Sequence, residues 1–385
     1  MRRAQQWTAA CVLVVAGFLA TVARYYHPAY GFTAFLELPA ATHDSELPAV
    51  RESPHYDHPG SGGYDGQFYA QLAVEPLLRN PDIDRALDNP PYRAHRILFP
   101  WIAWTMGFGR PAWILQAAAI ENVLVWLALA WLLWRVIRPA SARAFVLWSG
   151  CLLAHGLLMS VRYALPDGLS VLLIALAALA VERGRPIVGS LVIGAAGLAR
   201  ETSVLAATSL VQFVRRSPRS WLFVLGCLIL CVLPLVLWLD YLRSIYRLRV
   251  LAGGEHITEP LSGLAWKLKS VSAWVWRDGV TAMTRDDLAS LAGFLTQGSW
   301  LVWRIVRYRD LSAWALTGAS FLVLTLMTHQ AVWDGTPGAY TRVAMPLTIA
   351  VNVLLARDPR TSWWLIGLVN LSVVPGMALM FMFRF

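Results

Sequence analysis

The sequence opens with "MRRAQQWTAACVLVVAGFLATVARYY" (residues 1–26), in which two arginines precede an apolar run of membrane-spanning length. At about 1.5 Å per residue, a helix over residues 7–25 extends nearly across the roughly 30 Å hydrocarbon core of a bilayer. A basic start, an apolar run and small residues near Ala23 are also typical of a cleaved signal peptide. We expect a retained first span, because many further apolar segments follow it.

Composition extends this interpretation to the whole chain. Of its 385 residues, 57% are hydrophobic and 15% are charged, which argues against a set of soluble domains. The net charge of +10 would suit a nucleic-acid partner, but most arginines lie in short clusters between apolar segments. We therefore predict an all-α polytopic membrane protein, a single transmembrane domain over residues 1–385 that contacts membrane lipids and no nucleic acid.

The apolar segments predict about eleven transmembrane helices. After the first, we place spans near residues 112–134, 144–161, 166–181, 186–199, 203–214, 220–240, 288–306, 312–330, 340–356 and 362–383. The segment "RILFPWIAWTMGFG" (residues 96–109) is apolar but extends only about 20 Å as a helix, so we expect it to be re-entrant or interfacial.

Charge placement predicts the orientation of these spans. The proposed cytoplasmic connections are rich in arginine and poor in acids, which is the positive-inside pattern. Their arginines are Arg135, Arg138, Arg143, Arg183, Arg185, Arg215, Arg216, Arg219, Arg307, Arg309, Arg357 and Arg360. A cytoplasmic N-terminus then leaves three polar regions outside, at residues 26–96, 241–287 and 329–342.

Two of the outside regions contain predicted helices. In the large first loop (residues 26–96), "QFYAQLAVEPLL" has helical spacing and follows a glycine-rich turn. In the second loop (residues 241–287), "WKLKSVSAWVWRDG" is basic and rich in tryptophan, which predicts an amphipathic helix at the membrane interface. This helix is either an aromatic anchor or a contact for anionic lipid head groups.

Charged residues at the ends of short spans are the main functional signal. Arg162 and Asp167 flank a turn, Arg200 and Glu201 lie at the tip of a hairpin, and Arg342 lies just inside a span. The hairpin arms of about 14 and 12 residues rise only about 18–21 Å, so the tip ends within the membrane thickness. Such charges require a hydrated, protein-lined cavity, in which Thr202 or Ser203 caps the next helix. Alternatively, the two neighbouring pairs are structural ion pairs.

The segments that hold these charges resemble a known family. "YDGQFY" (64–69), "YRAHRILFPWIA" (92–103), "PDG" (166–168), "ARET" (199–202) and "YTRVAMPL" (340–347) resemble, in this order, the bacterial members of the GT-C superfamily of integral membrane glycosyltransferases. "YDGQFY" is similar to the "WDG-x-W/Y" element of polyprenyl- or dolichyl-phosphate-sugar mannosyltransferases, with tyrosine in place of the commoner tryptophan. The likeness covers most of the chain as an order of short elements.

The resemblance implies an inverting glycosyltransferase of the bacterial inner membrane. It implies a polyprenyl-phosphate-linked sugar as donor, a glycan, lipid or protein on the outside as acceptor, and Asp65 as catalytic base. An inverting transfer needs one base for the acceptor hydroxyl, and the departing phosphate needs positive charge. The candidates for phosphate contact are Arg200 and Arg342 first, then Arg96, Arg162 and Arg93, because a guanidinium binds two phosphate oxygens and keeps its charge.

The remaining site residues have less defined roles. Glu201 and Asp167 are expected to orient the arginines or to bind sugar hydroxyls. Gly63 and Gly66 would permit close approach of a substrate, while Tyr64, Phe68 or Tyr69 stack on a sugar ring or simply pack. For Asp65 itself, the alternative is a turn residue that caps the helix "GQFYAQL".

No cofactor is predicted from the sequence. His55, Asp57 and His58 form a candidate group of ligands for a divalent metal, but no further well-spaced ligand accompanies them, so a solvated loop is the default. Two rival functions remain open: a transporter or flippase of lipid-linked sugars, and a non-catalytic assembly protein for surface polysaccharide.

Overall fold

The computed structural model describes residues 2–214, 220–246 and 258–381, and the regular elements among them are all helices. Arg215, Arg216 and Arg219 of the predicted cytoplasmic connections lie outside the described residues, as do residues 247–257 of the second loop and the end of the last predicted span. The fold class is thus helical, as the composition predicts.

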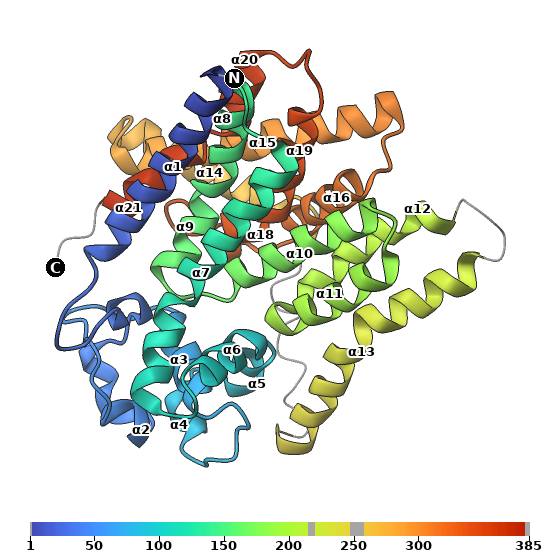
Figure 1. The fold of residues 1–385 in the computed structure, drawn as a ribbon. Coiled ribbons are helices and arrows are strands. Elements are labelled where there is room, and N and C mark those ends of the chain that lie inside the picture. Colours follow the sequence, from blue (N-terminus) through green and yellow to red (C-terminus); the bar gives the residue numbers. More distant parts are fainter. Residues whose placement is uncertain (1, 215–219, 247–257, 382–385) are drawn as a thin grey trace.

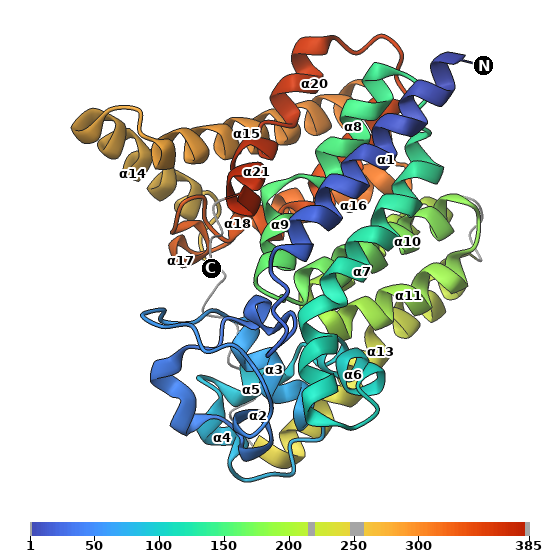
Figure 2. The same ribbon diagram turned by 60° about the vertical axis from the view of Figure 1, so that its left-hand side comes forward.

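The first polar segment forms a lobe beyond the end of the first helix, α1 (Arg2–Ala23), as Figures 1 and 2 show. The lobe is built from short elements: η1 (Thr33–Leu36), η2 (Ala40–Ser45), α2 (Pro48–Arg51), α3 (Gly66–Val74), α4 (Ile83–Ala86), α5 (Pro90–Ala94) and α6 (Leu98–Met106). The helix predicted after the glycines is α3. The nine-residue α6 is far shorter than a span, in agreement with the prediction for this segment.

The rest of the chain forms the helical body. Its elements are α7 (Pro111–Ile137), α8 (Ala142–Leu152), α9 (His155–Arg162), α10 (Asp167–Glu182), α11 (Pro186–Ala199), η3 (Glu201–Leu210), α12 (Val211–Val214), α13 (Ser220–Tyr246), α14 (Ser262–Asp278), α15 (Ala282–Tyr308), α16 (Ala313–Leu326), α17 (Gln330–Trp333), α18 (Tyr340–Val343), α19 (Met345–Ala356), α20 (Trp363–Val369) and α21 (Val373–Phe381).

Three helices of the described chain are long and apolar enough to cross a membrane. They are Gln5–Ala23, Pro111–Ile137 and Trp221–Tyr246. The pairs α8 with α9 and α20 with α21 also qualify if each is one span, bent by 43° and 49°. The protein is therefore a helical membrane protein, with three to five spans by length and composition, and the larger number stays a prediction.

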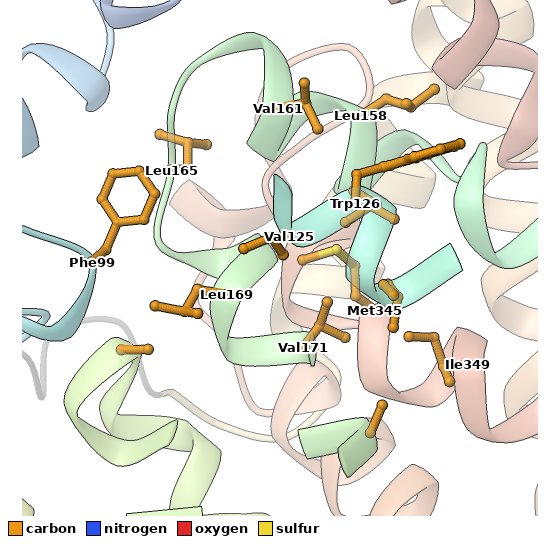
Figure 3. Packing of buried hydrophobic residues seen from close by; sticks show 14 of the residues in the cluster. Phe99, Val125, Trp126, Leu158, Val161, Leu165, Leu169, Val171, Met345 and Ile349 are labelled. Atoms are coloured by element: carbon orange, nitrogen blue, oxygen red, sulfur yellow. The ribbon is translucent and has the colours of Figure 1, made fainter. Parts of the chain in front are cut away.

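The core of the body lies where four helices meet. Figure 3 shows Trp126 of α7 near Leu158 of α9, Val171 of α10 and Met345 of α19. The indole of Trp126 is fully buried and donates to the carbonyl of Leu152 at 2.9 Å. In lipid, such helices associate through close packing rather than through expulsion of water, so buried shape and internal hydrogen bonds determine how these helices fit together.

The lobe is tied to the body at its far side by α13 (Figure 1). The indole of Trp238 donates to the carbonyl of Ala94 at 2.8 Å, and the hydroxyl of Tyr241 donates to that of Leu77 at 2.7 Å. The end of α5 and the segment after α3 are thereby held next to the last turns of a long apolar helix. This contact closes one wall of the cavity described below.

Candidate functional site

A cavity of about 500 Å³ lies between the lobe and the body. Its wall includes Asp65, α5 and the turn after it, the junction of α11 with η3, the end of α13, and α17 with α18. The residues that line it are Asp65, Tyr92, Arg93, His95, Arg96, Arg200, Glu201, Thr202, Leu239, Arg243, Leu324, Thr328, Ala331, Val332, Ala339, Arg342 and Val343. Segments far apart in the sequence therefore meet around one space.

Asp65 lies immediately before α3 but does not cap it. The side chain makes no capping hydrogen bond to the helix. Its carboxylate instead lies 3.0 Å from Nη1 of Arg93 and 3.8 Å from Nη1 of Arg342. The capping interpretation of Asp65 is thus wrong, because two guanidinium groups attract the carboxylate more strongly than backbone N–H groups do.

The electrostatic surroundings keep Asp65 ionised. Burial alone would raise the pKa of this carboxyl, but Arg93, Arg342 and Arg96 outweigh it and hold the pKa below its usual value. The Arg93 guanidinium is itself fixed by a two-point ion pair with Asp88, at 2.9 and 2.7 Å. Asp65 is therefore an anion held at the edge of a cationic cavity.

The glycines on either side of Asp65 serve packing, not substrate approach. A Cβ on Gly66 would lie 2.3 Å from the carbonyl oxygen of Tyr163 and 2.9 Å from that of Leu36, so only glycine fits there. At Gly63, φ is +76° and a Cβ would meet the side chain of Gln67 at 2.4 Å. The expectation that both glycines admit a substrate is therefore wrong, and Gly66 instead seats Asp65 against the body.

The buried charges pair across the fold and not with their sequence neighbours. Arg200 contacts Asp167 of α10, and Arg96 binds Glu201 through two nitrogens at 3.3 and 3.1 Å. The alternative of local pairs, Arg162 with Asp167 and Arg200 with Glu201, is therefore wrong. Helix packing brings each carboxylate to an arginine from a distant segment.

Arg342 joins the two sides of the site. Its Nη1 lies 3.2 Å from Asp167 and 3.8 Å from Asp65, and its Nη2 lies 3.5 Å from the hydroxyl of Tyr64. Asp167 itself is only 2% exposed and faces a small hollow with Arg200 and Arg342. The acid on α10 thus orients two arginines that line the cavity, in agreement with the orienting role expected for it.

Arg162 is not part of the cavity lining. Its side chain is fully buried and pairs with Glu37, and its Nη1 donates to the carbonyl of Ala34 at 3.4 Å. The expectation of a phosphate contact for Arg162 is wrong, because this guanidinium is enclosed by η1 and the segment after it. Its place in the fold is an anchor between the lobe and α9.

The aromatic residues near Asp65 have packing roles. Tyr69 is 1% exposed and accepts a hydrogen bond from Nη1 of Arg96 at 3.1 Å. Tyr64 stacks on Tyr163 with ring centroids 4.4 Å apart, and Phe68 lies under the guanidinium of Arg93 at 4.6 Å. Tyr69 cannot stack on a sugar, and Tyr64 and Phe68 already have ring or guanidinium partners.

The expected helix cap after Arg200 is also absent from the described structure. The 3₁₀ helix η3 begins at Glu201 without a side-chain cap. Ser203 shares a hydrogen bond of 2.7 Å with Ser170 of α10, and Thr202 is one of the residues that line the cavity. The tip of the hairpin is thus held by its contact with α10.

Sequence reasoning missed several cavity residues. One of them is the uncharged Tyr92, whose hydroxyl accepts a hydrogen bond from Nη2 of Arg96 at 2.8 Å. The two residues are four positions apart in the sequence, a spacing that indicates contact on a helical turn. Arg243 lines the cavity because α13 continues to Tyr246, beyond the predicted end of that span. Glu37, the partner of Arg162, has no local signal in the sequence.

The second loop differs from its prediction at one lysine. The predicted amphipathic helix is α14, and Trp276 on it is 93% exposed. Lys267, however, is fully buried and pairs with Asp287 at 2.6 Å, so it is not available to lipid head groups. α15 begins at Ala282, earlier than predicted, because Thr281 and Thr284 form a capping box there.

The candidate metal ligands in the first loop are rearranged as well. His58 lies apart from the other two, with Nε2 3.0 Å from the carbonyl of Ala34. His43 and Glu46 come to His55 and Asp57 instead. The expectation that no further ligand accompanies His55 and Asp57 is therefore wrong.

The balance of charge indicates what the cavity can bind. Five arginines and two carboxylates line it, and Asp88 and Asp167 pair with lining arginines from outside the lining, so a formal surplus of one positive charge remains. The Nε–H groups of Arg200 and Arg342 are buried and have no acceptor among the described residues. Such unpaired donors next to a space of this size suit an anion with several oxygen atoms.

Comparison of the chain with models of protein families, with characterised proteins and with solved structures gives no significant match.

Proposed function

We propose that the protein is a GT-C-like glycosyltransferase that transfers a sugar from a polyprenyl-phosphate carrier to a glycan or glycolipid acceptor. The observation that carries the proposal is the position of Asp65, an ionised carboxylate at the edge of a cavity lined by Arg93, Arg96, Arg200 and Arg342. One wall of this cavity is the end of the apolar helix α13, which suits a substrate with a hydrocarbon chain.

In this proposal Asp65 is the base. Its carboxylate takes the proton of the acceptor hydroxyl while the hydroxyl oxygen forms a bond to the anomeric carbon of the donor sugar. The bond from that carbon to the phosphate oxygen breaks, and its electron pair stays on the phosphate. No acid is needed on the departing side, because polyprenyl phosphate leaves as an anion.

Arg342 and Arg200 bind the departing phosphate. Both carry a buried Nε–H without an acceptor, and both are oriented from behind by Asp167. Negative charge on the phosphate oxygens grows as the glycosidic bond breaks, so fixed guanidinium groups stabilise the transition state more than the bound donor.

Binding of the donor also prepares the base. Arg342 lies 3.8 Å from Asp65 and contributes to its lowered pKa. A phosphate that binds Arg342 compensates this positive charge, so the pKa of Asp65 rises towards the value that suits proton transfer. The same arginine thereby couples the arrival of the donor to the strength of the base.

The proposal includes a place and an orientation. The chain would lie in a bacterial inner membrane with a cytoplasmic N-terminus, about eleven spans, and the cavity towards the outside. The arginine-rich connections support this orientation through the positive-inside rule. The lipid-linked donor then enters from the membrane and the acceptor from the outside.

The test is transfer of a labelled sugar from polyprenyl phosphate in membranes that contain the protein. We expect Asp65→Asn to abolish transfer, because the amide cannot accept the proton, while expression and thermal stability persist. Asp82→Asn is a matched control in the same loop, since Asp82 is exposed and makes no cap hydrogen bond with its side chain.

Unaltered transfer by Asp65→Asn would remove Asp65 as the base. A reconstituted protein that moves the lipid-linked sugar across vesicles and forms no new glycosidic bond would instead identify a flippase.

A further inference from the structure

Four potential metal ligands gather in the first loop, outside the cavity lining. His43, Glu46, His55 and Asp57 each direct one ligand atom into the same small volume, and these atoms lie within 4.8 Å of one another. They come from two segments, the end of η2 and residues 55–57, which are joined by the backbone bridge between Pro39 and His58. The fold therefore brings two ligands from each side together.

Four distances between a histidine nitrogen and a carboxylate oxygen in the cluster are close to those around a tetrahedral ion. Nδ1 of His43 lies 3.7 Å from Glu46 and 3.5 Å from Asp57, and Nε2 of His55 lies 3.6 Å from Glu46 and 3.0 Å from Asp57. Bonds of about 2.0–2.1 Å to a central zinc place the ligand atoms of a tetrahedron about 3.3 Å apart. Since no two of the four ligand atoms are more than 4.8 Å apart, an ion can be seated between them when the side chains close around it.

His55 is oriented as a ligand. Its Nδ1 lies 2.8 Å from the carbonyl oxygen of Ser53, and a carbonyl can only accept, so Nδ1 carries the hydrogen. Nε2 is then the nitrogen that faces the carboxylates of Glu46 and Asp57, and it can supply its lone pair to an ion seated between them. A carbonyl that fixes the far nitrogen is the usual support of a metal-binding imidazole.

Glu46 supplies a second, independent observation. It is 4% exposed, and neither of its carboxylate oxygens has a hydrogen-bond partner among the described residues. The next residue is fixed, because the N–H of Leu47 donates to the buried side chain of Gln71 on α3 at 2.9 Å. A carboxyl group in this position ionises only with a cation next to it, because burial raises its pKa.

We propose that His43, Glu46, His55 and Asp57 bind one zinc-like divalent cation that fixes the first loop. Two imidazole nitrogens and two carboxylate oxygens are ligands that Zn²⁺ accepts, whereas Mg²⁺ and Ca²⁺ prefer oxygen ligands alone. Four protein ligands leave no open position in a tetrahedron, so the ion is structural. His43 and Asp57, both more than a third exposed, form the solvent side through which it arrives.

The ion would brace the element that carries Asp65. It joins η2 to residues 55–57, and Gln71 links the end of η2 to α3, whose first residue follows Asp65. The site therefore stabilises the lobe whether or not the cavity transfers sugar.

The test is the metal content of the purified protein in detergent, measured by elemental mass spectrometry after removal of metal with a chelator and addition of zinc alone. We expect about one zinc per chain and a higher melting temperature with zinc, because a ligand that binds only the folded state stabilises it. Magnesium at the same concentration should give neither effect.

Two variants at the solvent side make the test specific. We expect His43→Gln and Asp57→Asn to weaken zinc binding by more than the roughly 10–100-fold that follows loss of a supporting residue. Asp44→Asn is the matched control, since Asp44 is exposed and lies between two ligands without joining the cluster. Wild-type protein that takes up no zinc, or binding that is equal in His43→Gln, Asp57→Asn and Asp44→Asn, would overturn the proposal.

Discussion

The molecule contains two groups of charged residues that differ in their balance. Around the cavity, five arginines face two carboxylates beside about 500 Å³ of space. Under α14, Lys267 meets Asp287 at 2.6 Å and the carbonyl of Gly335 at 2.6 Å, and both charged side chains are fully buried. The first group has a surplus of charge and room beside it, while the second is neutral and closed.

This difference shows which buried charges point to function. A buried pair of one cation and one anion balances its own charge and holds elements together, here α14 and α15. A surplus of guanidinium groups with unpaired N–H donors remains unsatisfied until an anion arrives. Burial of charge alone is therefore a poor sign of a site, and the excess over pairing is a better one.

The largest expected effect is a loss of stability on substitution of Lys267 in the closed pair. Lys267→Met leaves Asp287 buried without its cation, and removal of one partner from such a pair costs about 3–5 kcal/mol. We expect a large fall in the melting temperature of the detergent-solubilised protein. The double variant Lys267→Met with Asp287→Leu should recover most of the loss, because no charge is then left unpaired.

The distinction between the two groups would be wrong if the double variant is as unstable as the single one and also loses sugar transfer at temperatures where it is folded. The closed pair would then do more than hold helices.

The cavity should respond in the opposite way, with a large loss of activity and a small loss of stability. In Arg342→Gln, Asp167 keeps Arg200 and Asp65 keeps Arg93, so no carboxylate is left alone. Loss of one charge-stabilising donor typically reduces turnover by about 10²–10³-fold. We expect a reduction of this size in sugar transfer, with a melting temperature close to that of the wild type.

Arg360→Gln is the control for this measurement, because Arg360 is exposed and lies outside the cavity lining. Full activity of Arg342→Gln would mean that the surplus charge is not used for the donor phosphate.

Local features of the fold could be predicted from the sequence. The first arm of the hairpin, α11, runs from Pro186 to Ala199 as predicted, and a proline occupies its first position, where the missing N–H costs nothing. The helix after Asp65 was also predictable from the spacing of its apolar residues. Signals of this kind depend on neighbours within a few turns.

The pairing of the charges was not predictable in this way. Arg162 pairs with Glu37, 125 positions away, and Arg96 with Glu201, 105 positions away. Helix packing decides such contacts, and nothing in the local sequence distinguishes Glu37 from a solvated acid. The same holds for Lys267. Its place on an amphipathic helix predicts lipid contact, but in the structure the packing of α14 buries it. Four of the five cavity arginines were found from the sequence, whereas Arg243 and the partners of the arginines required the structure.

The smallest effect concerns pH and Asp65. The pKa of Asp65 is lowered in the free protein, so the carboxylate stays ionised as the pH falls from about 8 to about 5. Protonation removes the base only below the usual range of aspartate pKa values. The same sign holds for stability: the contribution of ionised Asp65 is present above the unfolded pKa of about 3.9 and is lost as the pH falls through the lower folded pKa.

Bound donor should shift this limit, because its phosphate offsets the charge of Arg342. We therefore expect the acid limb of kcat, which reports the complex, at higher pH than the acid limb of kcat/KM, which reports the free protein. Arg342→Gln should bring the two limbs together by raising the limb of the free protein. The double variant at Lys267 and Asp287 should leave both limbs in place, since these charges lie outside the cavity. Limbs that coincide in the wild type would show that the phosphate does not reach Arg342.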